Sequence, residues 1–194
     1  MQKKCLKMLR NLRKLSILSK IAKKQKTDDI VDVILFGSAA RGKEEPRDFD
    51  ICVVFRDKID FKKIRDIEKE YERHKMVIHL SFLTADNFFT KPHSLAKTLL
   101  LEGKSLFTSK KVSSNYGLAG KTIFLYKLKD MKPSEKVKFI HALKGRRKNE
   151  GILSTIKDKL LAPSFIMIPT SEEHKIVSIL DYWNVSYKRI KLLL

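Results

Sequence analysis

The sequence feature that most constrains the fold is a pair of apolar runs joined by a glycine-serine turn and a short polar segment. The first run, Ile30–Phe36, ends at Gly37 and Ser38. The second run, residues 51–55, follows directly after Asp48 and Asp50. This order predicts a strand, a tight turn, a short connection and a second strand. Because side chains alternate along a strand, the two carboxylates are expected to point the same way.

The chemistry of these residue types indicates a phosphate site with a metal ion. Two adjacent carboxylates repel each other unless a cation lies between them, and a hard divalent ion such as Mg²⁺ is the usual partner. Gly37 allows a backbone to approach a ligand closely, and Ser38 with the neighbouring amides can donate hydrogen bonds to phosphate oxygens. A phosphate-binding turn together with carboxylates that hold Mg²⁺ is the minimum set of groups that phosphoryl or nucleotidyl transfer requires.

The same residues resemble the signature of a known enzyme family. The glycine-serine turn, nine intervening residues and the paired aspartates between two apolar strands resemble the polymerase-beta-like nucleotidyltransferase superfamily, in its minimal branch. The resemblance runs from about residue 28 to about residue 108 and includes the stretch Leu99–Phe107. It implies an α/β nucleotidyltransferase core around a small mixed sheet.

The resemblance also implies roles for single residues. Gly37 and Ser38 would hold the triphosphate of a nucleotide, and Arg41 would help to neutralise its charge. Asp48 and Asp50 would bind Mg²⁺, which bridges the phosphates during in-line attack on the α-phosphorus. The nucleotide would be a nucleoside triphosphate, with ATP the expected one.

The sequence departs from the family pattern at the third carboxylate, which members usually carry on the next strand. The next predicted strand is Met76–Phe82, and His79 occupies the expected position, on its more polar face. His79 could serve as a metal ligand or general base. It could instead mark a loss of catalysis, or the register could differ so that Asp86 supplies the acid.

Composition limits the class of protein. No stretch reaches the roughly 18 uninterrupted apolar residues that a membrane span requires. Lysines and arginines recur through residues 1–26, a pattern that argues against a signal peptide. Cys5 and Cys52 lie far apart and belong to no metal-ligand cluster, so we expect reduced thiols in a cytoplasmic protein.

The net charge of +20 is distributed unevenly. Residues 1–30 carry 10 Lys/Arg against 2 Asp/Glu, residues 31–119 carry 16 against 13, and residues 120–194 carry 16 against 7. Basic flanks around a nearly balanced core are typical of proteins that bind RNA or DNA. The alternative is a lysine-rich surface that only solvates the protein, as in some thermophiles.

Periodicity predicts three helices in the first two thirds of the chain, over Lys3–Lys24, Asp60–His74 and Pro92–Glu102. The polar, glycine-bearing segment Thr108–Gly120 is the expected domain boundary. The sequence therefore predicts an amphipathic helix over residues 1–27, a nucleotidyltransferase domain over residues 28–110 and a small basic α+β domain over residues 118–194.

Within the C-terminal domain, alternating and helical patterns predict two helices and three strands. The helices are Ser134–Leu143, capped by Ser134, and Ser171–Trp183; the strands are Ile152–Ile156, Ser164–Ile168 and Val185–Leu193. The basic loop between them supplies the candidate nucleic-acid contacts Lys144, Arg146, Arg147 and Lys148. A solvated basic turn is the alternative. The aromatic residues at helical or strand spacing are expected in the core, with base stacking as the alternative: Tyr126, Phe139, Tyr182, Trp183 and Tyr187.

Two functional hypotheses follow. The first is a Mg²⁺-dependent nucleotidyltransferase that moves AMP from ATP onto a hydroxyl of a protein or of RNA. The resemblance implies a small helical partner protein as one such acceptor, with this chain as the antitoxin. The second is a nucleotidyltransferase-fold module that has lost catalysis and binds nucleic acid or a partner protein.

Overall fold

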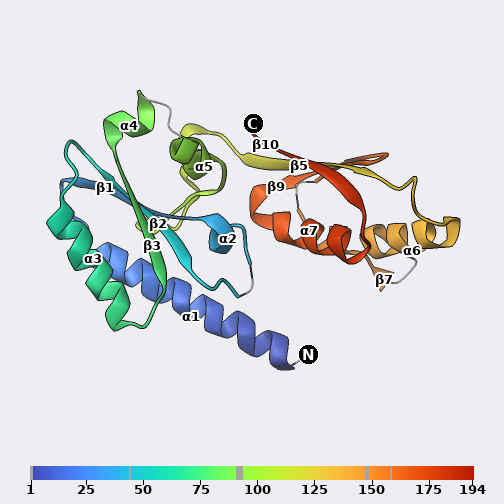
Figure 1. Cartoon of the computed structure of the whole chain (residues 1–194), viewed down its shortest axis with the longest axis horizontal. Coiled ribbons are helices and arrows are strands. Elements are labelled where there is room, and N and C mark those ends of the chain that lie inside the picture. Colours follow the sequence, from blue (N-terminus) through green and yellow to red (C-terminus); the bar gives the residue numbers. More distant parts are fainter. Residues whose placement is uncertain (1, 44, 91–93, 147–148, 158) are drawn as a thin grey trace. The chain divides into compact units, whose positions relative to one another are not determined.

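The structure is a computed structural model that describes residues 2–43, 45–90, 94–146, 149–157 and 159–194. The chain divides into two compact units, Met1–Leu118 and Ala119–Leu194, and each has its own sheet and apolar core (Figure 1). No helix in the described ranges could span a lipid bilayer. The mixed α/β architecture predicted from the sequence is confirmed.

The first unit is built on a mixed four-stranded sheet in the order β3-β2-β1-β4. Its strands are β1 (Ile30–Phe36), β2 (Phe49–Phe55), β3 (Ile78–Thr84) and β4 (Lys104–Ser105). β1 pairs antiparallel with β2 and β4, whereas β2 and β3 are parallel. Parallel neighbours need a crossover connection, and α3 (Phe61–Arg73) provides it.

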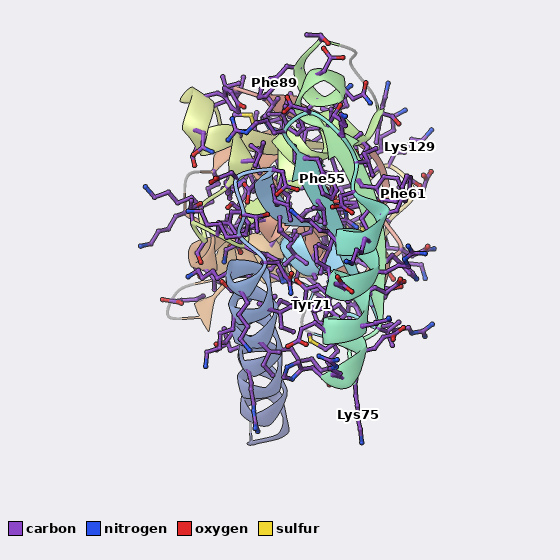
Figure 2. All side chains as sticks on the ribbon, turned by 90° about the vertical axis from the view of Figure 1, so that its left-hand side faces the viewer. Phe55, Phe61, Tyr71, Lys75, Phe89 and Lys129 are labelled. Atoms are coloured by element: carbon purple, nitrogen blue, oxygen red, sulfur yellow. The ribbon has the colours of Figure 1, made fainter. Side chains whose placement is uncertain are left out.

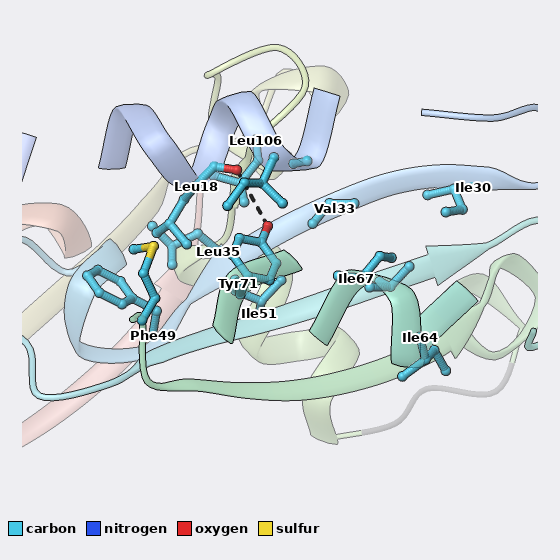
Figure 3. Packing of buried hydrophobic residues seen from close by; sticks show 14 of the residues in the cluster. Leu18, Ile30, Val33, Leu35, Phe49, Ile51, Ile64, Ile67, Tyr71 and Leu106 are labelled. Atoms are coloured by element: carbon cyan, nitrogen blue, oxygen red, sulfur yellow. Dashed lines mark hydrogen bonds between the residues drawn. The ribbon is translucent and has the colours of Figure 1, made fainter. Parts of the chain in front are cut away.

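Two helices cover one face of this sheet: α1 (Gln2–Lys24) and α3 (Figure 1). Leu18 and Ile21 of α1 pack against Ile67 and Tyr71 of α3 in a fully buried cluster. The Tyr71 hydroxyl donates a hydrogen bond to the Leu18 carbonyl at 3.4 Å (Figure 3). The long basic helix is therefore part of the core of the first unit.

The opposite face is covered by α4 (Ala85–Phe89), α5 (Ser94–Glu102) and the 3₁₀ turn η1 (Val112–Tyr116). Leu99 of α5 packs on Ile34 and Cys52 of the sheet. Burial raises the pKa of the Cys52 thiol to about 12, with a smaller contribution from the charge of Asp32. At the outer surface of the unit, the exposed rings of Phe61 and Phe89 can be followed in Figure 2.

The second unit contains an antiparallel four-stranded sheet in the order β10-β5-β9-β8. Its strands are β5 (Gly120–Lys127), β8 (Leu160–Ala162), β9 (Phe165–Pro169) and β10 (Ser186–Leu193). α6 (Pro133–Lys144) follows the first of these strands, and α7 (Glu173–Tyr182) precedes the last. This β-α-β-β-α-β succession with the first and third strands at the centre is the split βαβ, or ferredoxin-like, motif.

Both helices of the second unit lie on one face of its sheet (Figure 1). Phe139 of α6 and Ile176 of α7 pack against Phe124 and Ile166, and all four side chains are fully buried. Tyr126 is also buried in this core, as predicted, whereas Tyr182 is 83% exposed and the prediction for it was wrong. Tyr182 is the last residue of α7, where a side chain can point away from the core.

Other details of the second unit differ from the sequence predictions. The apolar run predicted as the strand Ile152–Ile156 forms the 3₁₀ turn η2 (Ile152–Thr155). A short apolar run does not distinguish a strand from a buried helical turn, and here Leu153 and Ile156 are buried three residues apart. The N-cap of α6 is Lys132, not Ser134. Pro133 takes the first helical position, and the Lys132 amide donates to Glu135. The two remaining short strands and 3₁₀ turn are β6 (Gly145–Arg146), β7 (Asn149–Glu150) and η3 (Thr170–Glu172).

A buried ionic network attaches α7 to the sheet. The Glu173 side chain is 3% exposed and accepts hydrogen bonds from Arg189 at 2.6 Å and from the Thr122 hydroxyl at 3.1 Å. Lys191 lies 3.6 Å from the same carboxylate. Removing Glu173 would leave these donors without their acceptor.

We predict that Glu173→Ala lowers the free energy of unfolding of the second unit by about 1–2 kcal/mol, because the buried Thr122 hydroxyl loses an acceptor, whereas the half-exposed Arg189 can be hydrated. Trp183 is the single tryptophan of the chain and lies in this unit, so its fluorescence in a urea titration measures the effect. Asp130→Ala, at an exposed position, should change the stability by less than about 0.5 kcal/mol. Equal midpoints for the two variants would contradict the prediction.

Candidate active site

A tight turn at the end of β1 forms the base of the site. Gly37 has a φ of +70° and begins the short helix α2 (Gly37–Ala40). Phe36, the last residue of β1, pairs with Asp50 of β2, so the turn lies against that aspartate. A Cβ atom on Gly37 would lie 1.9 Å from the Asp50 Oδ2 atom. Only glycine allows both the backbone angle and this close approach.

Three titratable side chains converge beside this turn. The Nδ1 atom of His79 lies 3.6 Å from Asp48 Oδ2 and 3.5 Å from Asp50 Oδ1. The convergence follows from strand pairing, because Asp50 and His79 are direct partners in the parallel β2–β3 pair. The side chains are partly open to solvent, at 38% for Asp48, 29% for Asp50 and 65% for His79. A ligand could therefore reach all three.

The position of Asp86 relative to β3 tests the hypothesis that this residue supplies the third carboxylate in place of His79. Asp86 lies in α4, beyond the C-terminal end of β3, and accepts a hydrogen bond from Thr90. His79 is near the other end of the same seven-residue strand, about 20 Å away at roughly 3.3 Å per residue. The hypothesis that Asp86 supplies the third carboxylate is therefore wrong.

Glu102, the last residue of α5, contacts the turn, although the sequence predicted no role for it. Its side chain is 2% exposed and accepts hydrogen bonds from the Gly37 amide at 3.1 Å and from Arg41 Nη1 at 2.7 Å. The carboxylate therefore fixes both the turn and the arginine that follows it. The signal in the sequence was the place of Glu102 within the stretch Leu99–Phe107, which the resemblance to the family includes.

The remaining predicted site residues surround the turn or lie elsewhere. Ser38 is half-buried at the start of α2, and Arg41 directly follows that helix with 29% of its side chain exposed. Lys144 and Arg146 are exposed at the end of α6 and in β6, in the second unit. Arg147 and Lys148 lie outside the described residues. The nucleic-acid role of this basic loop stays a prediction.

The donor set fits a divalent cation that is shared with a nucleotide. Among the described residues, no group of three or more His, Cys, Asp and Glu side chains forms a self-sufficient metal site. Mg²⁺ does not require one, because it is usually bound by one or two carboxylates together with substrate phosphates and water. Asp48 and Asp50 converge from neighbouring positions and supply the two carboxylates.

Comparison with protein families identifies the class. Residues 17–112 match the family model described as polymerase beta, nucleotidyltransferase. This range contains the turn, both aspartates, His79 and Glu102. The match to the polymerase beta nucleotidyltransferase family thus covers most of the first unit of the chain. A search of curated proteins gives no match.

Solved structures with similar folds include two toxin–antitoxin complexes. One, a toxin–antitoxin crystal structure with AMP-PNP, is 17% identical over 53% of this chain and 77% of that chain, with a TM-score of 0.39. Another is the Shewanella oneidensis complex of a tri-AMPylated HEPN toxin with an MNT antitoxin. It is 18% identical over 57% of this chain and 77% of that chain, with a TM-score of 0.34.

We predict that Gly37→Ala destabilises the first unit more than Gly117→Ala does. Both glycines have a φ close to +70°, so alanine costs about 1–2 kcal/mol of backbone strain at either position. A Cβ on Gly117 meets nothing within 4 Å, whereas on Gly37 it overlaps Asp50. Moving the carboxylate should cost about 1–3 kcal/mol in addition.

The buried Cys52 thiol gives the measurement. In a Cys5→Ser background it reacts with a thiol reagent only when the first unit opens, so the labelling rate follows the opening equilibrium. Gly37→Ala should label at least about fivefold faster than Gly117→Ala, since 1.4 kcal/mol corresponds to a factor of ten. Equal rates would mean that the overlap with Asp50 is relieved at no cost.

Proposed function

We propose that the chain is a Mg²⁺-dependent nucleotidyltransferase that transfers AMP from ATP to a hydroxyl group of a protein or of RNA. The observation that carries the proposal is the convergence of Asp48, Asp50 and His79 beside the Gly37 turn, within a domain of the nucleotidyltransferase family. The acceptor oxygen would form a bond to the α-phosphorus. The bond from that phosphorus to the bridging oxygen would break, and pyrophosphate would leave.

The residues of the turn would hold the triphosphate. Gly37 lets the turn lie directly against Asp50, so that the triphosphate would meet the metal-binding carboxylate there, and Ser38 presents a hydroxyl donor. Arg41, whose Nη1 donates to Glu102, directly follows the turn and would help to neutralise the charge of the triphosphate. Asp48 and Asp50 would hold Mg²⁺, which when bound stabilises the negative charge that develops on the phosphate oxygens.

His79 would take the place of the third carboxylate of the family. A neutral imidazole can accept the proton of an attacking hydroxyl or coordinate a metal ion, and both roles need the position beside the two aspartates. His79 pairs with Asp50 across the two strands and is largely exposed to solvent. Both features favour contact between the imidazole and the hydroxyl that accepts the nucleotide.

The competing hypothesis is a binding module without catalysis. The observation in its favour is the same histidine, because an imidazole carries no negative charge with which to complete a metal site. In that case ATP would bind without transfer, or RNA, DNA or a small helical partner protein would bind in its place. Label transfer distinguishes the two hypotheses directly.

We predict transfer of radioactive label from α-³²P-ATP in the presence of MgCl₂ to an RNA oligonucleotide or to a candidate partner protein. Asp48→Asn and Asp50→Asn should each reduce the transfer rate by about a hundredfold or more, because each removes a carboxylate that would hold Mg²⁺ against the developing phosphate charge. Asp57→Asn, at an exposed position just after β2, is the matched control and should keep the wild-type rate. ATP binding without transfer to any acceptor would favour the competing hypothesis.

We predict that His79→Ala slows label transfer by about a hundredfold, the lower range for loss of a general base or its equivalent. His79→Asp should preserve or raise the rate, because it restores the carboxylate of the family pattern. His74→Ala, at the exposed C-terminal cap of α3, controls for the loss of an imidazole nearby in sequence. An unchanged rate in His79→Ala would remove this residue from the mechanism.

A further inference from the structure

The sheet of the second unit has one face that its two helices do not cover. Buried residues of β5 and β9 such as Phe124 and Ile166 pack against the helices, so their sequence neighbours point to the other side. Leu125 pairs with Phe165 across the two central strands, and Leu125 and Ile190 are 40% and 37% exposed. We name this surface the open sheet face; its residues are Ile123, Leu125, Phe165, Met167, Lys188 and Ile190.

The charged residues within the four strands have a single sign, whereas Asp130 and Glu135 line the same pocket as Lys127 beyond the end of β5. The sequences of the four strands contain no Asp or Glu. Lys188 pairs with Leu125 and is exposed on the face, and the exposed Lys127 ends the central strand β5. The apolar centre therefore has a cationic border within a region, residues 120–194, that carries 16 Lys/Arg against 7 Asp/Glu.

We propose that the open sheet face binds single-stranded RNA. Unpaired bases are flat and partly apolar, and they can lie on Phe165, Leu125 and Ile190. The phosphates that link them would meet Lys127 and Lys188, since cations that neutralise phosphates release bound counterions. A duplex cannot use this surface in the same way, because its bases are stacked and paired.

The chemistry of the surface favours RNA over a protein partner. A protein that covered this face would have to match exposed lysines with acidic residues at the border and an apolar patch at the centre. Every nucleotide of single-stranded RNA supplies both a negatively charged phosphate and a partly apolar base. The proposal does not involve Lys144 and Arg146 of the basic loop, which lie at the end of α6 and in β6, outside the four strands.

The proposed binding does not depend on nucleotidyl transfer. The full-length chain would be titrated into a fluorescein-labelled 12-nucleotide single-stranded RNA of mixed sequence, and fluorescence anisotropy would be recorded at several salt concentrations. Phe165→Ala should weaken binding by about fivefold or more through lost stacking. Lys188→Glu should weaken it and reduce the magnitude of the slope of log K against log salt by about one.

Lys138→Glu is the matched control, because it makes the same charge change at an exposed position on α6, on the helical side of the sheet. It should retain clearly tighter binding than Lys188→Glu, and unlabelled duplex RNA of the same length should compete at least tenfold less well than the single strand. Asp50→Asn should bind RNA like the wild type, which separates failure of this proposal from failure of the transferase proposal.

Three outcomes would overturn the proposal. Equal losses in Lys138→Glu and Lys188→Glu would show that the total positive charge binds RNA without a defined face. Unchanged affinity in Phe165→Ala and Lys188→Glu would place the RNA elsewhere on the chain. No RNA binding, combined with concentration-dependent self-association that Leu125→Glu abolishes, would show that the face is covered by a second copy of the protein.

Discussion

The close approach of the Asp50 carboxylate to the Cα atom of Gly37 is the contact on which the site depends. It follows from the antiparallel pairing of β1 and β2, which sets the end of one strand against the start of the other. The same turn carries the amide that Glu102 accepts from, and the parallel β2–β3 pair then adds His79. Residues from β1, β2, β3 and the end of α5 thus meet around Gly37, where the Asp50 carboxylate leaves no room for a side chain.

The part of the site that the sequence predicts is the part that strand geometry determines locally. Alternation along β2 places Asp48 and Asp50 together, and the apolar pattern of β3 is clear enough to put His79 beside them. Glu102 could not be found in this way, because its contacts with Gly37 and Arg41 span 65 and 61 residues. They depend on where α5 ends against the sheet, which no local pattern records.

The topology of the second unit was not predicted from the sequence, again because it depends on contacts between distant segments. Its central strand β5 carries Lys121 and Lys127 beside Phe124 and Tyr126, and this mixture gave no clear strand prediction. The helical side of the sheet is strongly apolar, whereas the open sheet face mixes apolar residues with lysine. A strand buried on one side only is recognised from its partners, and β5 pairs with β9 and β10, which lie about 40–70 residues later in the chain.

The charges around the Gly37 turn explain why a nucleotide would have to bring cations with it. Asp48, Asp50 and Glu102 place three carboxylates near the turn, and Arg41, which directly follows the turn, is hydrogen-bonded to Glu102. A free triphosphate is polyanionic, so its approach to two exposed aspartates is repulsive at close range. A divalent ion shared between the aspartates and the phosphates reverses that repulsion. On the proposed function, the arrangement would therefore favour a metal–nucleotide complex over the bare nucleotide, and the ion pair with Glu102 would reduce the positive charge that Arg41 offers to the phosphates.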